Sequence, residues 1–181
     1  MPRTRGFSLV ELVIVIIVIG IMAAVLSPLM LSSLRAYDTT LGNVVVLDKL
    51  RYATERLARE IREVNYNSNT GFAFTSMDAN ATTFTRTFYN SSGTATLATV
   101  TVGNTGSAVT LAYSTPAVAA QILTDELGNN SNLVFSYLDQ NGTVLGSPTP
   151  TTVYAVRIAL TLIHNGQPYT QRTQVELKNR S

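Results

Sequence analysis

The sequence predicts an α+β protein, in which a long N-terminal helix, membrane-spanning in its first half, packs on a C-terminal antiparallel β-sheet domain. Three observations carry this prediction. The chain of 181 residues opens with an almost wholly apolar run. An amphipathic helical pattern follows that run without a break. From Asn65 onward, short alternating segments rich in Thr, Ser and Asn replace the helical pattern.

The apolar run covers residues 7–31, and residues 12–26 contain no charged or strongly polar side chain. About 20 such residues span the hydrocarbon core of a bilayer. Arg3 and Arg5 precede the run, and the next basic residue is Arg35. Because a short basic flank stays on the cytoplasmic side, the rest of the chain is expected on the other side of the membrane.

An ordinary secretory signal is an alternative explanation of this run. Such a signal has a shorter apolar core followed by a small-residue cleavage site, for which Ala23 and Ala24 would serve. Glu11 fits a secretory signal poorly, because a carboxylate costs about 2.5–3.5 kcal/mol at mid-bilayer and less near an end. Taken alone, Glu11 is equally well explained as an interfacial side chain that reaches water.

The most specific pattern is the segment RGFSLVEL at residues 5–12. With its basic leader, it resembles the prepilin-peptidase recognition site of type IV pilins and type II secretion pseudopilins. The resemblance implies that residues 1–6 are a leader cut after Gly6, that Phe7 is then N-methylated, and that Glu11 is the glutamate of this motif. Pro28 also falls where many helices of this family carry a proline.

Charge pairing gives Glu11 a physical role. Cleavage after Gly6 would create a cationic amine on Phe7, and Glu11 lies four residues further, about 6 Å along a helix axis. Glu11 can neutralise this amine within one chain or meet the amine of a neighbour in a staggered filament. Pairing offsets much of the cost of holding either charge among apolar groups. We therefore predict that Glu11 sets the register of assembly.

Residues 32–64 continue the helix as an amphipathic segment, with apolar residues at spacings of three or four. Opposite charges stand four residues apart at Arg51/Glu55, Glu55/Arg59, Arg56/Glu60 and Arg59/Glu63. These interleaved glutamates favour a solvated helix face over a nucleic-acid or lipid site. Pro28 removes one helical hydrogen bond and Gly42 weakens its own turn, so both are predicted bend points or places where the helix melts on assembly.

Residues 65–181 are the predicted antiparallel β-sheet domain. Residues 65–71 are typical of a loop, and residues 164–168 of a turn. The predicted strands are 82–89, 95–102, 108–113, 133–138, 153–163 and 169–178. Residues 116–127 are compatible with a strand or a short helix. The resemblance implies the same architecture, the pilin fold.

No pattern in the sequence indicates an enzyme, a cofactor or a metal site. The chain has no cysteine, and its one histidine, His164, lies in a predicted turn. Asp139 to Gly142 fits a hairpin turn better than a calcium loop, because the further oxygen ligands and closing glutamate of such a loop are absent. Asp125 and Glu126 have no calcium-site spacing. Without Arg3 and Arg5 the 13 basic residues fall to 11, equal to the 11 acidic ones, so no basic field for nucleic acid remains.

The rank within the family rests on weaker signs. Residues 55–62 and the segments from Leu133 onward resemble minor pilins of the PilW and MshO kind and the J-type minor pseudopilin of type II secretion. The resemblance implies a minor pilin of a type IV, MSHA-like pilus, with a type II secretion minor pseudopilin, a major pilin and a non-polymerising membrane-anchored binding protein as alternatives. The implied partners are the prepilin peptidase, other pilin or pseudopilin subunits, the inner-membrane assembly platform and, before assembly, membrane lipid. The implied location is the bacterial inner membrane with a periplasmic C-terminal domain, then the pilus surface.

Overall fold

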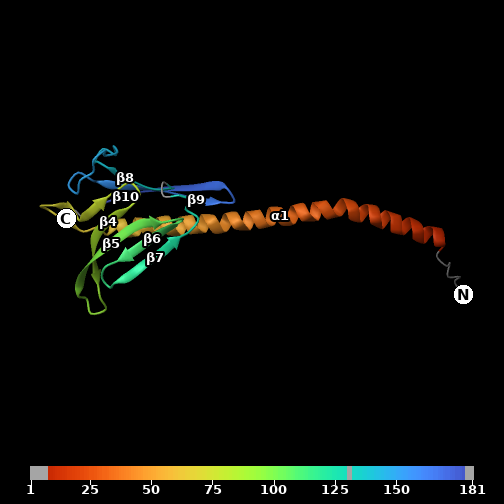
Figure 1. The fold of residues 1–181 in the computed structure, drawn as a ribbon, viewed down its shortest axis with the longest axis horizontal. Coiled ribbons are helices and arrows are strands. Elements are labelled where there is room, and N and C mark those ends of the chain that lie inside the picture. The colour runs from red at the N-terminus through yellow and green to blue at the C-terminus, as the bar shows by residue number, and fades with distance from the viewer. Residues whose placement is uncertain (1–7, 130–131, 178–181) are drawn as a thin grey trace. The chain divides into compact units, whose positions relative to one another are not determined.

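The computed structural model describes residues 8–129 and 132–177. It contains two compact units, which divide between Val44 and Val45. One helix and ten strands are assigned in the described residues, and the α+β prediction is confirmed (Figure 1).

The helix α1 runs from Leu9 to Arg62 and therefore ends two residues before the predicted Val64. Its end has a physical cause in the sheet. Val64 forms an isolated antiparallel bridge with Arg86, and the amide of Asn65 donates to the carbonyl of Thr85 at 3.0 Å. The chain thus leaves the helix because its backbone begins to pair with a neighbouring strand.

The strands of the second unit form two main antiparallel sheets and a short ribbon. The five-stranded sheet has the order β3-β4-β5-β6-β7, with β3 Phe74–Met77, β4 Thr82–Tyr89, β5 Ala95–Thr105, β6 Ala108–Tyr113 and β7 Val118–Thr124. The three-stranded sheet has the order β10-β9-β8, with β8 Leu133–Leu138, β9 Ala155–His164 and β10 Gln167–Glu176. The ribbon pairs β1 Tyr66–Asn67 with β2 Gly71–Phe72. The single sheet that the sequence predicted is thus corrected to these three.

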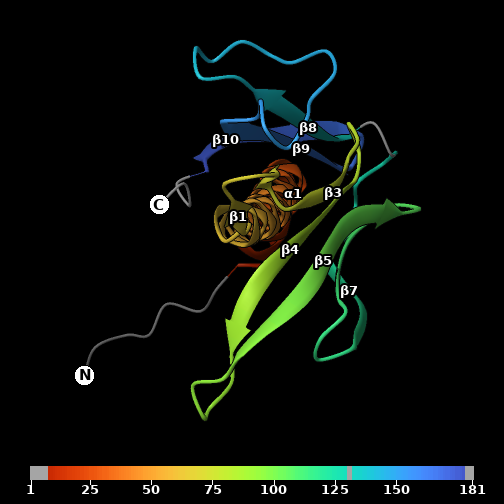
Figure 2. The same ribbon diagram turned by 90° about the vertical axis from the view of Figure 1, so that its left-hand side faces the viewer.

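The last turns of α1 lie between the two main sheets (Figure 2). Val46, Leu50, Ala53, Leu57 and Ile61 are buried at the predicted spacing of three or four. They join one apolar cluster with side chains of both sheets. One amphipathic helix therefore supplies the core that the two sheets share.

Several strands depart from the prediction. β5 continues to Thr105 instead of ending at residue 102, β9 runs from Ala155 to His164 instead of over 153–163, and β1, β2 and β3 were not predicted. Residues 118–124 form β7, so the region left open between strand and helix is a strand. β10 begins at Gln167 and includes Pro168, which was expected in the turn. Pro168 is tolerated there because β10 is an edge strand. A proline nitrogen on the side away from β9 removes no hydrogen bond between the two strands.

Candidate functional site

The described part of the first unit is helix from Leu9 onward, and its apolar side chains are uncovered. Every described residue from Ser8 to Leu41 is exposed within the chain. Among the described residues, α1 is the one helix long and apolar enough to cross a membrane. Because apolar groups all round a helix are stable only in lipid or against other proteins, this surface is the candidate functional site.

Ser8 caps the start of α1. The amide of Glu11 donates to Ser8 Oγ at 3.2 Å, and the amide of Leu12 donates to the Ser8 carbonyl at 3.2 Å. Ser8 and Glu11 thus stand in the spacing of a capping box, in which a serine and a glutamate satisfy amides at the helix start. The Ser-x-x-Glu pattern in the sequence is the signal for this cap, which was not among the predictions.

Glu11 lies exposed in the first turn of α1. A carboxylate there is favoured by the positive end of the helix dipole, whereas a cationic amine is disfavoured. A negative Glu11 would thus offset the unfavourable placing of an amine at this helix start. Gly6 and Phe7, the predicted cleavage and methylation positions, lie outside the described residues.

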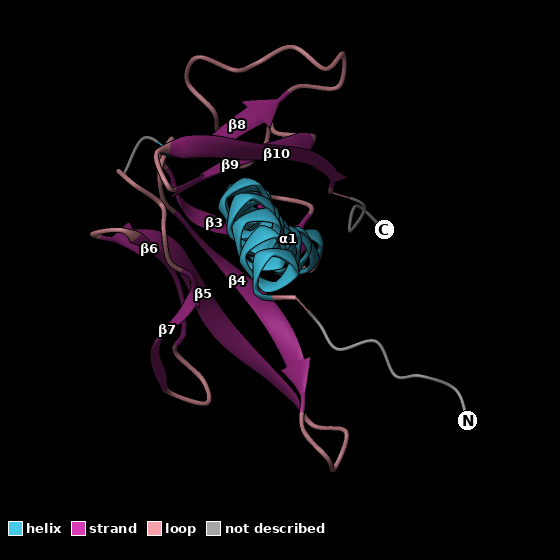
Figure 3. Cartoon of the chain, turned by 90° about the vertical axis from the view of Figure 1, so that its right-hand side faces the viewer, coloured by secondary structure: helices cyan, strands magenta, loops and turns pink. Residues whose placement is uncertain are grey.

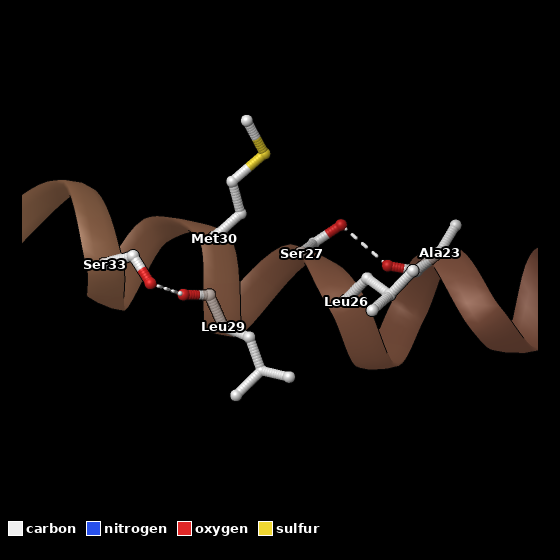
Figure 4. Close-up of a pocket in the computed structure, with 6 residues that line it drawn as sticks. All are labelled: Ala23, Leu26, Ser27, Leu29, Met30 and Ser33. Carbon is white, nitrogen blue, oxygen red and sulfur yellow. Dashed lines mark hydrogen bonds between the residues drawn. The ribbon is translucent and has the colours of Figure 1, made fainter.

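Pro28 and Gly42 both lie inside the continuous helix α1. Near Pro28, Ser27 Oγ donates to the Ala23 carbonyl at 2.7 Å, and Ser33 Oγ donates to the Leu29 carbonyl at 3.0 Å (Figure 4). These hydroxyls are satisfied within the helix, which suits an apolar environment. The structure therefore places both predicted bend points in α1, and their bending or melting stays a prediction.

A shallow groove lies on the helix surface beside Pro28. It is lined by Ala23, Leu26, Ser27, Leu29, Met30 and Ser33 (Figure 4). None of these side chains carries a charge, and both serine hydroxyls donate to the helix backbone. The groove is therefore suited to apolar contact rather than to chemistry.

In the second unit, a buried carboxylate joins α1 to the five-stranded sheet. The Glu60 side chain is only 1% exposed and lies 2.8 Å from Arg56 Nη2 and 2.6 Å from Arg86 Nη1. The Tyr113 hydroxyl donates to Glu60 Oε1 at 2.8 Å, and burial raises the pKa of Tyr113. The pair Arg56/Glu60 was predicted on a solvated face, and that part of the prediction is wrong. Arg51 and Glu55, in contrast, are exposed and 2.8 Å apart, as predicted.

The acidic residues considered for calcium have other partners. Lys49 Nζ lies 2.7 Å from Asp125 Oδ1 and 3.5 Å from Glu126 Oε1. The hydrogen bond from Lys49 lowers the pKa of Asp125 and raises that of Lys49 itself. Asp139 Oδ1 accepts from the amides of Asn141 and Thr143 at 2.8 Å each, which is a turn, as the sequence predicted.

Clusters of three or more His, Cys, Asp or Glu side chains suited to a metal do not occur in the described part of the chain. His164 lies at the end of β9, with Nδ1 3.5 Å from Glu126 Oε1. The ion pairs of Lys49, Arg86 and His164 join different segments of the second unit.

Comparison with protein-family models matches residues 1–27 to the prokaryotic N-terminal methylation motif. No curated protein matches the chain. The match supports a type IV prepilin or pseudopilin and implies processing by a prepilin peptidase and association with other pilins. The matched segment includes Gly6, Phe7 and Glu11, and it covers the first part of the apolar helix, which fits anchoring in the inner membrane.

Proposed function

We propose that this chain, which carries the N-terminal methylation motif of type IV prepilins and pseudopilins, is a minor subunit of a type IV, MSHA-like pilus. In this proposal the prepilin peptidase cuts between Gly6 and Phe7 and methylates Phe7. The subunit waits in the inner membrane, held by its apolar helix. The assembly platform then moves it into a filament, which it joins or primes.

One observation carries the proposal. The helix that follows the methylation motif exposes its apolar side chains on all sides from Leu9 to Leu41. A membrane covers such a helix before assembly, and helices of other subunits cover it afterwards. Both environments exclude water from the same side chains, so the exchange between them changes the burial of this surface little.

The minor rank is supported by sequence features outside the motif. Residues 55–62 and the segments from Leu133 onward resemble minor pilins of the PilW and MshO kind. The chain has no cysteine, whereas major pilins often carry a C-terminal disulfide loop. The same features fit the J-type minor pseudopilin of type II secretion, which differs from a minor pilin in where the processed chain is found.

Three residues of α1 have roles within this proposal. Glu11 sets the register by pairing with the amine of Phe7, in its own chain or in a neighbour. Pro28 and Gly42 let the helix bend or locally melt as it passes from lipid into the filament. The hydroxyl bonds of Ser27 and Ser33 to the helix backbone support this role near Pro28, because they satisfy polar groups while the helix is in lipid.

The proposal is tested by mass spectrometry of sheared surface filaments and of membranes from the native host, read at the N-terminus of this subunit. A chain starting at methylated Phe7, in traces beside an abundant major subunit, is the expected result. The same processed chain confined to membranes would indicate a type II secretion pseudopilin. A processed chain that makes up the bulk of the filaments would indicate a major pilin. An intact Met1–Gly6 leader without filament association would leave a membrane-anchored binding protein.

A further inference from the structure

We infer that the free edge of β10, with the arginines on both of its sides, binds an extended acidic peptide segment of a partner protein. The inference concerns the second unit only. It does not depend on the rank of the subunit in a filament, because it rests on α1 residues 54–62 and on β9 and β10.

The first observation is an open strand edge. β10 pairs with β9 along its full length, and it is the last strand of its sheet (Figure 3). Within the part of the chain that the structure describes, no strand pairs with the other edge of β10. Such an edge presents unpaired N–H and C=O groups, to which an extended peptide can add as the next strand.

The second observation is a groove between β10 and α1. It is lined by Thr54, Glu55, Ala58, Arg59, Arg62, Gln171 and Thr173. Arg59 and Arg62 are exposed, and neither has an ion-pair partner among the described residues. The one carboxylate in the groove, Glu55, lies 2.8 Å from Arg51 and is neutralised by it. The groove therefore offers two positive charges to a ligand.

The third observation is positive charge on the opposite side of β10. Odd-numbered residues of β10 face α1, and the even-numbered Arg172 is exposed on the outer face without an ion-pair partner in the described residues. Beside it, Arg157 Nη2 donates to the neutral Gln174 at 3.3 Å, so its charge is also not neutralised. Side chains of an added strand alternate between the two faces, and on both faces they would meet arginine.

The charges around the edge favour carboxylates on the added strand. β10 itself carries one arginine, Arg172, and one carboxylate, Glu176, on its outer face, so a second copy would bring mixed charges, whereas a strand with carboxylates at alternate positions would pair with the arginines. The helix dipole accounts for Arg59 and Arg62 in the last turns of α1, but it does not account for Arg157 and Arg172 on the sheet. An extended acidic peptide can place carboxylates near these four arginines while its backbone hydrogen-bonds to the free edge of β10.

The test uses the full chain in neutral detergent micelles and fluorescent heptapeptides. One peptide alternates threonine or valine with glutamate, and its control carries lysine in place of glutamate. We expect the acidic peptide alone to bind, with affinity reduced roughly tenfold or more in the double variant Arg59→Gln and Arg62→Gln. Arg35→Gln removes one positive charge from the first unit, away from the groove, and should bind like the unchanged chain.

A change in the peptide backbone distinguishes binding by strand addition from binding by charge attraction alone. The same acidic peptide, N-methylated at alternate residues, should bind much more weakly, and the unmethylated peptide should slow amide exchange in β10. Equal binding of both peptides, unchanged affinity in the Arg59/Arg62 variant, or no binding of the acidic peptide would overturn the inference. An oligonucleotide that binds with the same dependence on Arg59 and Arg62, while the acidic peptide does not, would also overturn it.

Discussion

At the residue scale, Glu60 shows how a charge is held inside this protein. Its carboxylate is buried, yet two guanidinium groups and one phenol contact it. Arg86 is itself only 12% exposed, stacks over the ring of Phe88 at 3.8 Å, and reaches Glu63 at 2.7 Å. A carboxylate in such a place is tolerated because each lost water contact is replaced by a charged or hydroxyl donor.

Removal of the Glu60 carboxylate should therefore destabilise the second unit strongly. We expect Glu60→Ala to lower the free energy of unfolding by about 3–5 kcal/mol, because it leaves Arg86 buried without its main partner. Urea unfolding of the full chain in detergent, followed by the near-ultraviolet dichroism of its tyrosines, measures this. Glu55→Gln removes an exposed carboxylate from the same helix and should leave the midpoint unchanged. Equal midpoints for the two variants would contradict this role of Glu60.

Glu11 combines two explanations that a pair of variants can separate. In a capping box with Ser8 the Glu11 side chain would accept from an amide at the helix start, and glutamine could take its place there. As a charge partner of the Phe7 amine it must be ionised. We expect Glu11→Gln to be processed normally but to enter filaments much less than the unchanged subunit.

Ser8→Ala is the matched control for Glu11. It removes the hydroxyl that accepts from the Glu11 amide and keeps the charge. We expect Ser8→Ala subunits to enter filaments nearly as well as the unchanged chain, measured by the same mass spectrometry of sheared filaments. Normal filament entry of Glu11→Gln, together with a loss in Ser8→Ala, would assign Glu11 to helix capping instead of register.

The sequence predicts these residue contacts only where they are local. The spacing of Arg56 and Glu60 indicates an ion pair on one helix face, and the pair exists. Arg86, however, lies 26 residues after Glu60, and nothing in its own strand marks it as a partner. Whether Arg56 and Glu60 are buried depends on how β4 and β6 pack against α1. No local sequence pattern predicts that packing.

At the scale of elements, three strands with clear turn residues at their ends were predicted best. β4, β6 and β8 have the predicted bounds, because turn residues limit their apolar segments on both sides. β7 was ambiguous because residues 119–122 are all exposed, which removes the alternation. The ribbon and β3 were missed since their segments are too short to show a period.

Gly71 illustrates a constraint between elements. Its φ is +81°, and a Cβ built on it would lie 2.6 Å from the carbonyl carbon of Pro150. The next residue, Phe72, donates its amide to the Pro150 carbonyl at 3.0 Å, so the two backbones must stay this close. A side chain at residue 71 would therefore push apart β2 and the loop before β9.

Gly142 is a matched control, with a φ of +80° and nothing within 4 Å of a built Cβ. We expect Gly142→Ala to cost about 1–2 kcal/mol from the left-handed backbone alone. Gly71→Ala should cost roughly a further 1–3 kcal/mol from the forced backbone shift. Urea unfolding of both variants measures the difference. Equal destabilisation would show that the loop at Pro150 can move away from residue 71 without a measurable energetic cost.

At the scale of the whole molecule, the two units bury their apolar groups in different ways. The second unit forms one internal cluster from α1 and both sheets. In the first unit the described apolar side chains, such as Ile14, Ile19 and Leu26, are exposed, and they need lipid or other subunits. The sequence predicted this contrast well, because a long uncharged run and an amphipathic pattern are strong local signals. The number of sheets was not predictable, since it depends on long-range pairing.

The orientation of the chain in the membrane can be tested directly, because the chain has no cysteine. Single cysteines can be placed at Ser92, exposed in the turn between β4 and β5, and at Ile19 within the apolar helix. In spheroplasts, a membrane-impermeant maleimide should label Ser92→Cys readily. Ile19→Cys should stay unlabelled, because lipid surrounds that position and keeps its thiol protonated and inaccessible.

A third cysteine, in the leader at Thr4, completes this test. If Arg3 and Arg5 hold the leader in the cytoplasm, Thr4→Cys should react only after the membrane is permeabilised. The label should also disappear when the prepilin peptidase is active, because residues 1–6 are then removed. Labelling of Thr4→Cys in sealed spheroplasts, or protection of Ser92→Cys, would reverse the assigned orientation and with it the access of the second unit to periplasmic partners.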